Sequence, residues 1–171
     1  MIANKYGKAL FEVLTPEERE QLRPVLKGLG EISKEPKFLL VMKSPLLSIE
    51  QKLEFIKEIT GVENPKLLNF VKILIINRRI ELLKPIYQVF NKLVADSTGR
   101  YEGVVEGDIE EEVIPQLEEM LGKKFNSTVK LQLKRRKVGG IKLFIDVLNV
   151  EVELVEKRLK ENLIQLILKA I

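Results

Sequence analysis

The chain contains neither cysteine nor histidine among its 171 residues. This absence excludes disulfide bonds, thiolate nucleophiles, Ser-His-Asp triads and zinc sites built from nitrogen and sulfur ligands. Any enzymatic chemistry would have to depend on carboxylates, Lys, Tyr or Ser. Chains without disulfides are typical of a reducing compartment, so we expect a cytoplasmic location.

Long apolar runs are absent as well. None reaches the roughly 18 residues that a membrane-spanning helix needs, and the first residues, Met1 to Tyr6, lack the apolar region of a signal peptide. Only 10 Gly and 7 Pro occur, whereas 45% of the residues are hydrophobic and 32% are charged. This balance is typical of a folded chain with one ordinary domain or two small ones.

The formal net charge of +4 is unevenly distributed. Residues 1–100 carry 17 Lys and Arg against 12 Asp and Glu, whereas residues 101–171 carry 12 against 13. So modest an excess is weak evidence for nucleic-acid binding, which usually shows a concentrated basic stripe. Solubility is the simpler explanation of this excess. A further hypothesis is that the positive charge of the first hundred residues speeds encounter with an acidic partner.

The first hundred residues are predicted to form six helices. Apolar residues recur every three or four positions, Thr15 and Ser48 begin capping boxes, and prolines stand at the expected first turns. The predicted ranges are about 2–14, 16–33, 36–41, 49–60, 65–76 and 85–96. Because 67–76 is apolar nearly all round, we expect it to be the most buried helix.

The pattern changes after Gly99. We predict a strand over 101–107, a helix over 110–121, a strand over 129–133, a hairpin of 141–147 and 150–154, and a final helix over 155–169. The expected fold is mainly α. An N-terminal six-helix bundle over 1–99 is followed by a small α+β domain over 100–171 with a short mixed sheet and a C-terminal helix.

Charged clusters offer few candidates for chemistry. Lys134 to Lys137 is the densest basic run and leaves an RNA-binding module as an alternative, although a solvated strand end is favoured because no aromatic platform accompanies it. Gly139 and Gly140 match no phosphate-loop pattern and are interpreted as a structural turn. Glu110 to Glu112 and Glu118-Glu119 are interpreted as solvated acids. We therefore expect no catalytic, metal or cofactor site.

Two features suggest binding to a partner. Tyr6 lies on the apolar face of the first predicted helix, either in the core or in an exposed groove between helices. The segment from Leu163 to Ile171 is richer in apolar residues than one packed helix face requires, which indicates contact with a partner helix.

Several phrases resemble the delta subunit of the bacterial rotary ATP synthase, whose mitochondrial relative is the oligomycin-sensitivity-conferring protein. The phrases stand in the family's order and cover essentially the whole chain. They are Lys5-Tyr6-Gly7-Lys8-Ala9-Leu10-Phe11-Glu12, Asn69-Phe70-Val71-Lys72-Ile73-Leu74, Asn77-Arg78-Arg79-Ile80-Glu81-Leu82-Leu83, Val129-Lys130-Leu131, Val138-Gly139-Gly140-Ile141 and Arg158-Leu159.

The resemblance implies a non-catalytic, peripheral membrane subunit of the stator, active in ATP synthesis and proton transport. Its helical domain would bind the N-terminal helix of an alpha subunit in a groove between the first and fifth helices, lined by Tyr6, Ala9, Leu10, Val13, Phe70, Ile73, Leu74 and Asn77. Its second domain would bind the C-terminal ends of the b subunits through Leu159, Leu163, Leu166 and Ile167. Nucleic acid would not be a partner, and the complex would place the protein at the cytoplasmic face of the cell membrane.

The second domain departs from the family pattern at two places. Lys134 and Arg135 stand where the family often has Asp-Pro, and Val152-Glu153-Leu154-Val155 replaces an Asp-x-Ser-Val run. These departures surround the predicted hairpin, so they concern the contacts of the second domain rather than its fold.

Overall fold

The computed structural model describes residues 1–135, 141–145 and 150–154. Internal contacts divide the chain into two compact units, Met1–Val94 and Ala95–Ile171, and each is considered by itself. The sequence places the boundary between independently folding domains after residue 99, which stays a prediction.

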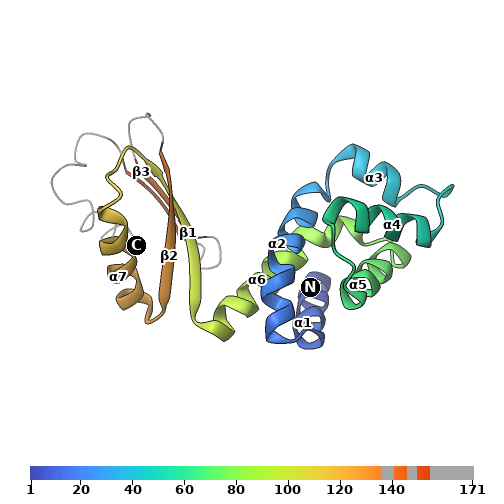
Figure 1. The fold of residues 1–171 in the computed structure, drawn as a ribbon, viewed down its shortest axis with the longest axis horizontal. Coiled ribbons are helices and arrows are strands. Elements are labelled where there is room, and N and C mark those ends of the chain that lie inside the picture. The colour runs from blue at the N-terminus through green and yellow to red at the C-terminus, as the bar shows by residue number, and fades with distance from the viewer. Residues whose placement is uncertain (136–140, 146–149, 155–171) are drawn as a thin grey trace. The chain divides into compact units, whose positions relative to one another are not determined.

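The first unit is helical (Figure 1). The predicted succession of six helices is confirmed, with a short 3₁₀ segment added before the last one. The helices are α1 (Ile2–Val13), α2 (Pro16–Ile32), α3 (Pro36–Met42), α4 (Ile49–Thr60), α5 (Pro65–Ile76), the 3₁₀ segment η1 (Ile80–Leu82) and α6 (Leu83–Thr98).

Local signals set the starts of these helices. Both predicted capping boxes are present: Ser48 Oγ accepts from the N–H of Gln51 at 3.1 Å, and Gln51 Oε1 accepts from the N–H of Ser48 at 2.9 Å. Thr15 forms the same arrangement at the start of α2. At the start of α5 the Asn64 side chain accepts two backbone N–H groups. These bonds satisfy amide groups that have no partner inside the helix.

Buried side chains from all six helices form the core of this unit. α1 and α6 approach closely at Gly7, where a Cβ atom would lie 2.7 Å from Val89 Cγ1. The expectation that α5 is the most buried helix is wrong, because four of its 12 residues are buried against six of 16 in α6, and Ile73 and Ile76 are 40% and 55% exposed. One apolar face of α5 is therefore left at the surface.

The second unit contains a mixed sheet and one described helix (Figure 1). Its elements are β1 (Arg100–Gly107), α7 (Val113–Phe125), β2 (Thr128–Arg135), β3 (Ile141–Ile145) and β4 (Val150–Leu154). The strand order is β2-β1-β3-β4, with β1 and β2 parallel and the other neighbours antiparallel. The predicted mixed sheet and hairpin are confirmed, and α7 provides the crossover that the parallel pair needs.

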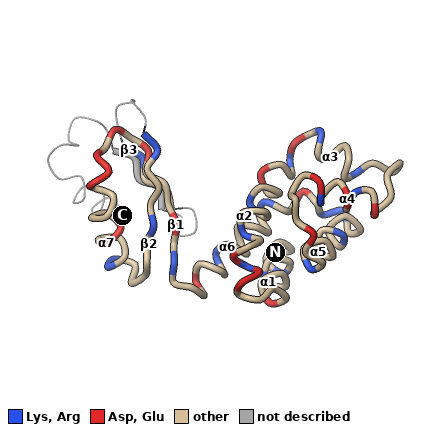
Figure 2. The backbone as a smooth tube through the Cα atoms, viewed as in Figure 1, with Lys and Arg blue, Asp and Glu red and all other residues tan. Residues whose placement is uncertain are grey.

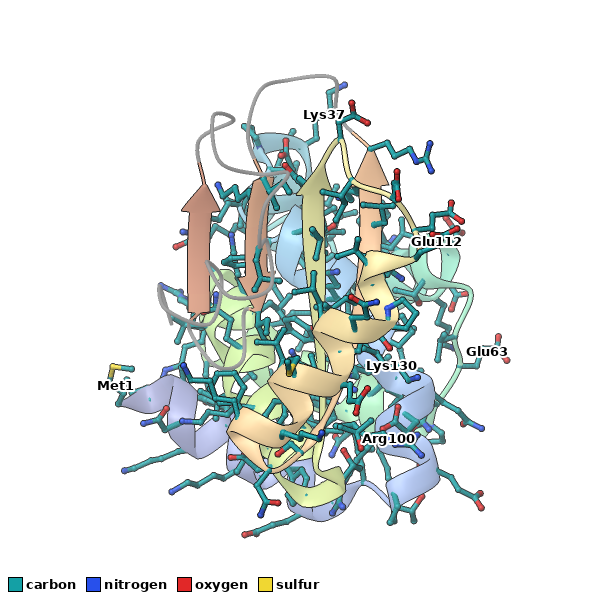
Figure 3. The ribbon with its side chains drawn as sticks, turned by 90° about the vertical axis from the view of Figure 1, so that its left-hand side faces the viewer. Met1, Lys37, Glu63, Arg100, Glu112 and Lys130 are labelled. Carbon is teal, nitrogen blue, oxygen red and sulfur yellow. The ribbon has the colours of Figure 1, made fainter. Side chains whose placement is uncertain are left out.

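One face of the sheet packs on α7. Figure 3 faces this unit from the helix side and shows α7 crossing in front of the strands, with Glu112 near its N-terminal end. Alternate strand residues and two leucines of α7 form a separate core. Its buried members are Val105, Ile109, Leu117, Leu121, Val129, Leu131, Ile141, Leu143 and Ile145.

α7 begins three residues later than predicted, so Glu110 to Glu112 precede it and no acid lies in its first turn. Pro115 explains the difference. A helix starting at residue 110 would place this proline in its interior, whereas a start at Val113 puts it in the first turn, where its missing N–H costs nothing. The helix then continues to Phe125, and Asn126 ends it with a left-handed backbone (φ 50°).

Several predicted features fall outside the described residues. They include the Gly139-Gly140 turn, the hairpin turn near Leu148-Asn149 and the final helix. The proposed contact residues Leu159, Leu163, Leu166 and Ile167 lie there too. Among the helices that the structure describes, none has the length and apolar character needed to cross a membrane.

Candidate functional site

α1 exposes an apolar stripe beside its buried face. Ile2, Tyr6, Ala9 and Val13 follow one another at spacings of three and four, which places them on one side of the helix. Ile2 is 46% exposed and Val13 is 57% exposed, whereas Tyr6 is half-buried. The stripe is thus available to another molecule along most of the helix.

α5 exposes a second stripe. Ile73 and Ile76 lie one turn apart at its surface, and exposed Asn77 follows Ile73 at a spacing of four. Phe70 stands one turn before Ile73 and is 7% exposed.

Tyr6 connects the two stripes. Its ring meets that of Phe70 edge to face, with centroids 6.3 Å apart and planes at 76°. Its hydroxyl oxygen accepts hydrogen bonds from Asn77 Nδ2 at 2.8 Å and from Arg79 Nη1 at 3.1 Å. The Arg79 guanidinium also lies 5.6 Å from the centre of the tyrosine ring. One side chain of α1 therefore packs on α5 and binds the turn that follows it.

We call the combined stripes the α1/α5 surface. Its members are Ile2, Tyr6, Ala9, Val13, Ile73, Ile76 and Asn77.

Most of the eight residues named from the sequence for a groove lie at or next to this surface. Tyr6, Ala9, Val13, Ile73 and Asn77 belong to it, and Phe70 packs directly beneath. Leu10 and Leu74 are 2% and 0% exposed, so they support it from the core and offer no surface of their own.

Three residues of this region were not among those named for the groove. Ile2 precedes Tyr6 by four positions and Ile76 follows Ile73 by three, so helical spacing alone could have identified both. Arg79 lies beyond the end of α5, and its bond to Tyr6 joins residues 73 positions apart. No local pattern reveals such a contact.

The turn that ends α5 has an unusual residue at its centre. The N–H of Arg79 donates to the carbonyl of Leu74 at 2.8 Å, and the N–H of Arg78 donates to the carbonyl of Ile75 at 3.1 Å. These bonds define a Schellman motif, in which the residue after the cap adopts the left-handed conformation and is usually glycine. Here that residue is Arg78, with φ 57°.

The acidic candidates of the second unit have structural partners. Glu118 accepts the backbone N–H of Leu131 at 3.2 Å and lies 3.8 Å from Lys130 Nζ. It thereby binds α7 to the outer edge of β2, which is an edge strand among the strands that the structure describes. Glu119 pairs with Lys123 at 3.3 Å. These contacts indicate a structural role for the two glutamates.

The basic cluster is described only at Lys134 and Arg135, which end β2. Arg135 lies 3.8 Å from a carboxylate oxygen of Glu111, so a neighbouring acid partly offsets its charge. Nothing in these two positions favours the RNA-binding alternative.

Two surface depressions lie outside the α1/α5 surface. One is apolar, about 390 Å³, and lined by Pro24, Val25, Gly28, Leu29, Ile32, Ile59 and Thr60. The other is broad and polar, about 760 Å³, between α7 and the starts of β1 and β2. Within the described residues no three acidic side chains gather to hold a metal ion.

Comparison with known proteins shows similarity along the whole chain. Residues 2–163 match the family model described as ATP synthase delta (OSCP) subunit. A protein of Campylobacter concisus named ATP synthase subunit delta is 33% identical over 173 residues, covering 100% of this chain and 98% of the relative. One of Campylobacter hominis with the same name is 35% identical, with 99% and 98% covered.

A chain in the cryo-EM structure of the Toxoplasma gondii mitochondrial ATP synthase hexamer has a similar fold. The TM-score is 0.61, the sequence identity is 19%, and the match covers 97% of each chain.

Proposed function

Because the chain belongs to the ATP synthase delta (OSCP) subunit family, we propose that its helical unit binds the N-terminal helix of an alpha subunit on the α1/α5 surface. The chain is a non-catalytic, structural component of the peripheral stalk of F-type ATP synthase. It serves ATP synthesis and proton transport as part of a membrane-associated complex. What we propose is the identity of the partner and the residues that contact it.

The contact of Tyr6 with Phe70, Asn77 and Arg79 carries this proposal. It keeps two exposed apolar stripes at a fixed separation before any partner arrives. An amphipathic helix binds such a surface through anchors spaced by three, four and seven residues. Because the surface is already formed, binding would require little reorganisation of the helical unit.

The second unit is proposed to bind the C-terminal ends of the b subunits. The support is the apolar spacing of Leu159, Leu163, Leu166 and Ile167 in the sequence. The b subunits would connect the protein to the membrane and would hold it at the cytoplasmic face as a peripheral subunit. Through these two contacts it would hold the catalytic head against the torque of the rotor.

The test is titration calorimetry of the full chain with a peptide of the alpha subunit's N-terminal helix from the same organism. We expect saturable one-to-one binding. Ile73→Asp should weaken it at least about tenfold, because a charge would replace an apolar anchor. Tyr6→Phe should weaken it less, since the ring stays while the hydroxyl that Asn77 and Arg79 bind is lost.

Leu46→Asp is the matched control. Leu46 is 90% exposed, lies between α3 and α4, and is not one of the residues of the α1/α5 surface. It should leave both affinity and circular dichroism unchanged. Absence of binding by the folded wild-type chain, or equal losses in the Ile73 and Leu46 variants, would contradict the proposed partner site.

A further inference from the structure

We propose that the α1/α5 surface selects a partner helix with acidic residues beside its apolar anchors, and that Arg78 is a specificity-determining contact to one of those carboxylates. The inference rests on the proposed function and deepens it, since it names the chemistry of the partner. Two independent observations support it, the distribution of charge and the backbone of Arg78.

The net positive charge of residues 1–94 comes from the elements that carry the surface. α1, α5 and the turn 77–79 contain six Lys and Arg against one acid, Glu12. The rest of residues 1–94 contains ten basic and ten acidic residues. Figure 2 marks these positions along the backbone. The net charge of the unit therefore lies next to its exposed apolar stripes.

Most of these basic groups remain available to a partner. Lys66 Nζ is 2.6 Å from Glu18, but the exposed side chains of Lys5, Lys8, Lys72 and Arg78 make no ion pair within the described part of the chain. Lys5 follows Ile2 by three residues and precedes Ala9 by four, so it borders the α1 stripe. Lys72 precedes Ile76 by four and borders the α5 stripe.

Complementary acids would face these groups on a bound helix. Exposed charges at the rim of an interface contribute mainly to encounter and partner choice, while the apolar anchors supply most of the affinity. An amphipathic helix with acidic flanks therefore fits the surface better than a neutral or basic one.

Arg78 has a conformation that its local role does not require. A glycine would complete the Schellman motif without the steric strain that a side chain meets at φ 57°. Arg79, in the same turn, already places a cation near the negative end of the α5 dipole. A strained residue that persists without a local benefit points to a function at the surface. Here the benefit would be an exposed guanidinium on the residue next to Asn77, which can pair with a carboxylate of the partner.

The test compares affinity and stability in the same full-length variants. Arg78→Gly should raise the thermal unfolding midpoint or leave it unchanged, while it weakens binding of the alpha-subunit N-terminal peptide about three- to fivefold. A merely structural role for Arg78 would move both quantities in the same direction. Arg78→Lys should retain most of the affinity, and Lys27→Gln, on exposed α2 surface, should have no effect.

The peptide provides the reciprocal test. Replacing its Asp and Glu by Asn and Gln should weaken binding to the wild-type chain, and the loss should be smaller with Arg78→Gly. Affinity should also fall as salt rises. Equal affinity of Arg78→Gly and wild type, or of the acidic and amidated peptides, would overturn the inference and leave the proposed function intact. Failure of the peptide to bind wild type would overturn the proposed function and this inference with it.

Discussion

The helical unit and the mixed unit differ in how far apart in sequence the residues lie whose hydrogen bonds set their secondary structure. In the helical unit the capping bonds join residues three apart, such as Ser48 and Gln51. In the mixed unit Arg100 pairs with Thr128, and Val104 pairs with Phe144. Local contacts close with little loss of chain entropy, whereas these strand pairs enclose long loops. The difference means that the helix starts of the first unit can be predicted from short stretches of sequence, whereas the strand order and register of the second cannot.

The two units also differ in how they use charge. The described ion pairs of the mixed unit bind its own elements together, as Glu118 does between α7 and β2. In the helical unit, by contrast, several lysines and Arg78 lie beside apolar side chains and make no ion pair with any residue that the structure describes. These charges of the mixed unit are paired within the chain, whereas those of the α1/α5 surface are suited to a partner.

The largest expected effect separates the core of α5 from its surface. Leu74→Ala removes a fully buried side chain and should lower the free energy of unfolding by about 2–5 kcal/mol. Ile73→Ala, at the adjacent position, should cost less than about 1 kcal/mol, because that side chain is 40% exposed. Urea unfolding followed by circular dichroism measures both.

The same pair should reverse its order in the binding assay. Ile73→Ala should weaken the binding of the alpha-subunit peptide. Leu74→Ala should keep the affinity of the wild-type chain under conditions where the helical unit stays folded. Similar stability losses in the two variants would mean that α5 has no exposed face, and the comparison between core and surface would fail.

The start signals of the helices were predictable because each lies within a few residues of the helix it begins. Thr15, Ser48 and Asn64 needed no tertiary information. The start of α7 was misplaced although Pro115 was visible, because the acidic run before it suggested an earlier start. The burial of α5 was also overestimated, since hydropathy does not reveal whether an apolar face meets the core or a partner.

The α1/α5 surface was predictable in part. The resemblance identified Tyr6, Phe70 and Asn77, which the structure brings together. Composition could not distinguish Leu10 and Leu74, in the core, from Val13 and Ile73, at the surface, because all four are aliphatic. The left-handed backbone at Arg78 had no sequence signal, since no glycine follows α5.

An intermediate effect is expected in the mixed unit at Gly103. A Cβ atom there would lie 2.8 Å from Ile145 Cγ1, 2.9 Å from the carbonyl oxygen of Phe144 and 3.0 Å from Leu131 Cδ2. Gly103→Ala should therefore destabilise the sheet by about 1–3 kcal/mol. Hydrogen exchange followed by mass spectrometry should show faster exchange in β1, β2 and β3, with α1 to α5 unchanged.

Gly28→Ala is the control for that substitution, because open space surrounds the position where its Cβ would stand. Faster exchange of α1 to α5 in Gly103→Ala would show that the two units unfold together. The two units would then differ in the sequence separation of their contacts but would not differ in when they unfold.

The smallest effect concerns a link between two helix starts. Glu18, in the first turn of α2, accepts hydrogen bonds from Lys66 Nζ at 2.6 Å, from Asn64 Nδ2 at 3.0 Å and from the N–H of Thr15 at 3.1 Å. These bonds, that of Lys66 first, lower the pKa of Glu18 from 4.5 to about 2. The charged carboxylate thereby joins α2 to the start of α5.

A lowered carboxyl pKa sets the sign of the pH dependence. The unfolded chain takes up the proton near pH 4.5, whereas the folded chain resists protonation until about pH 2. The contribution of Glu18 to stability is therefore present above pH 4.5 and is lost as pH falls toward 2. Glu18→Gln should be less stable than wild type at pH 6, and the two should converge by pH 2.

Glu17→Gln removes the same charge from the same turn, where no bond to α5 exists among the described residues, so its deficit at pH 6 should be smaller. If both variants showed the same deficit and the same convergence, helix-dipole electrostatics alone would account for Glu18, and the link between α2 and α5 would carry no stability.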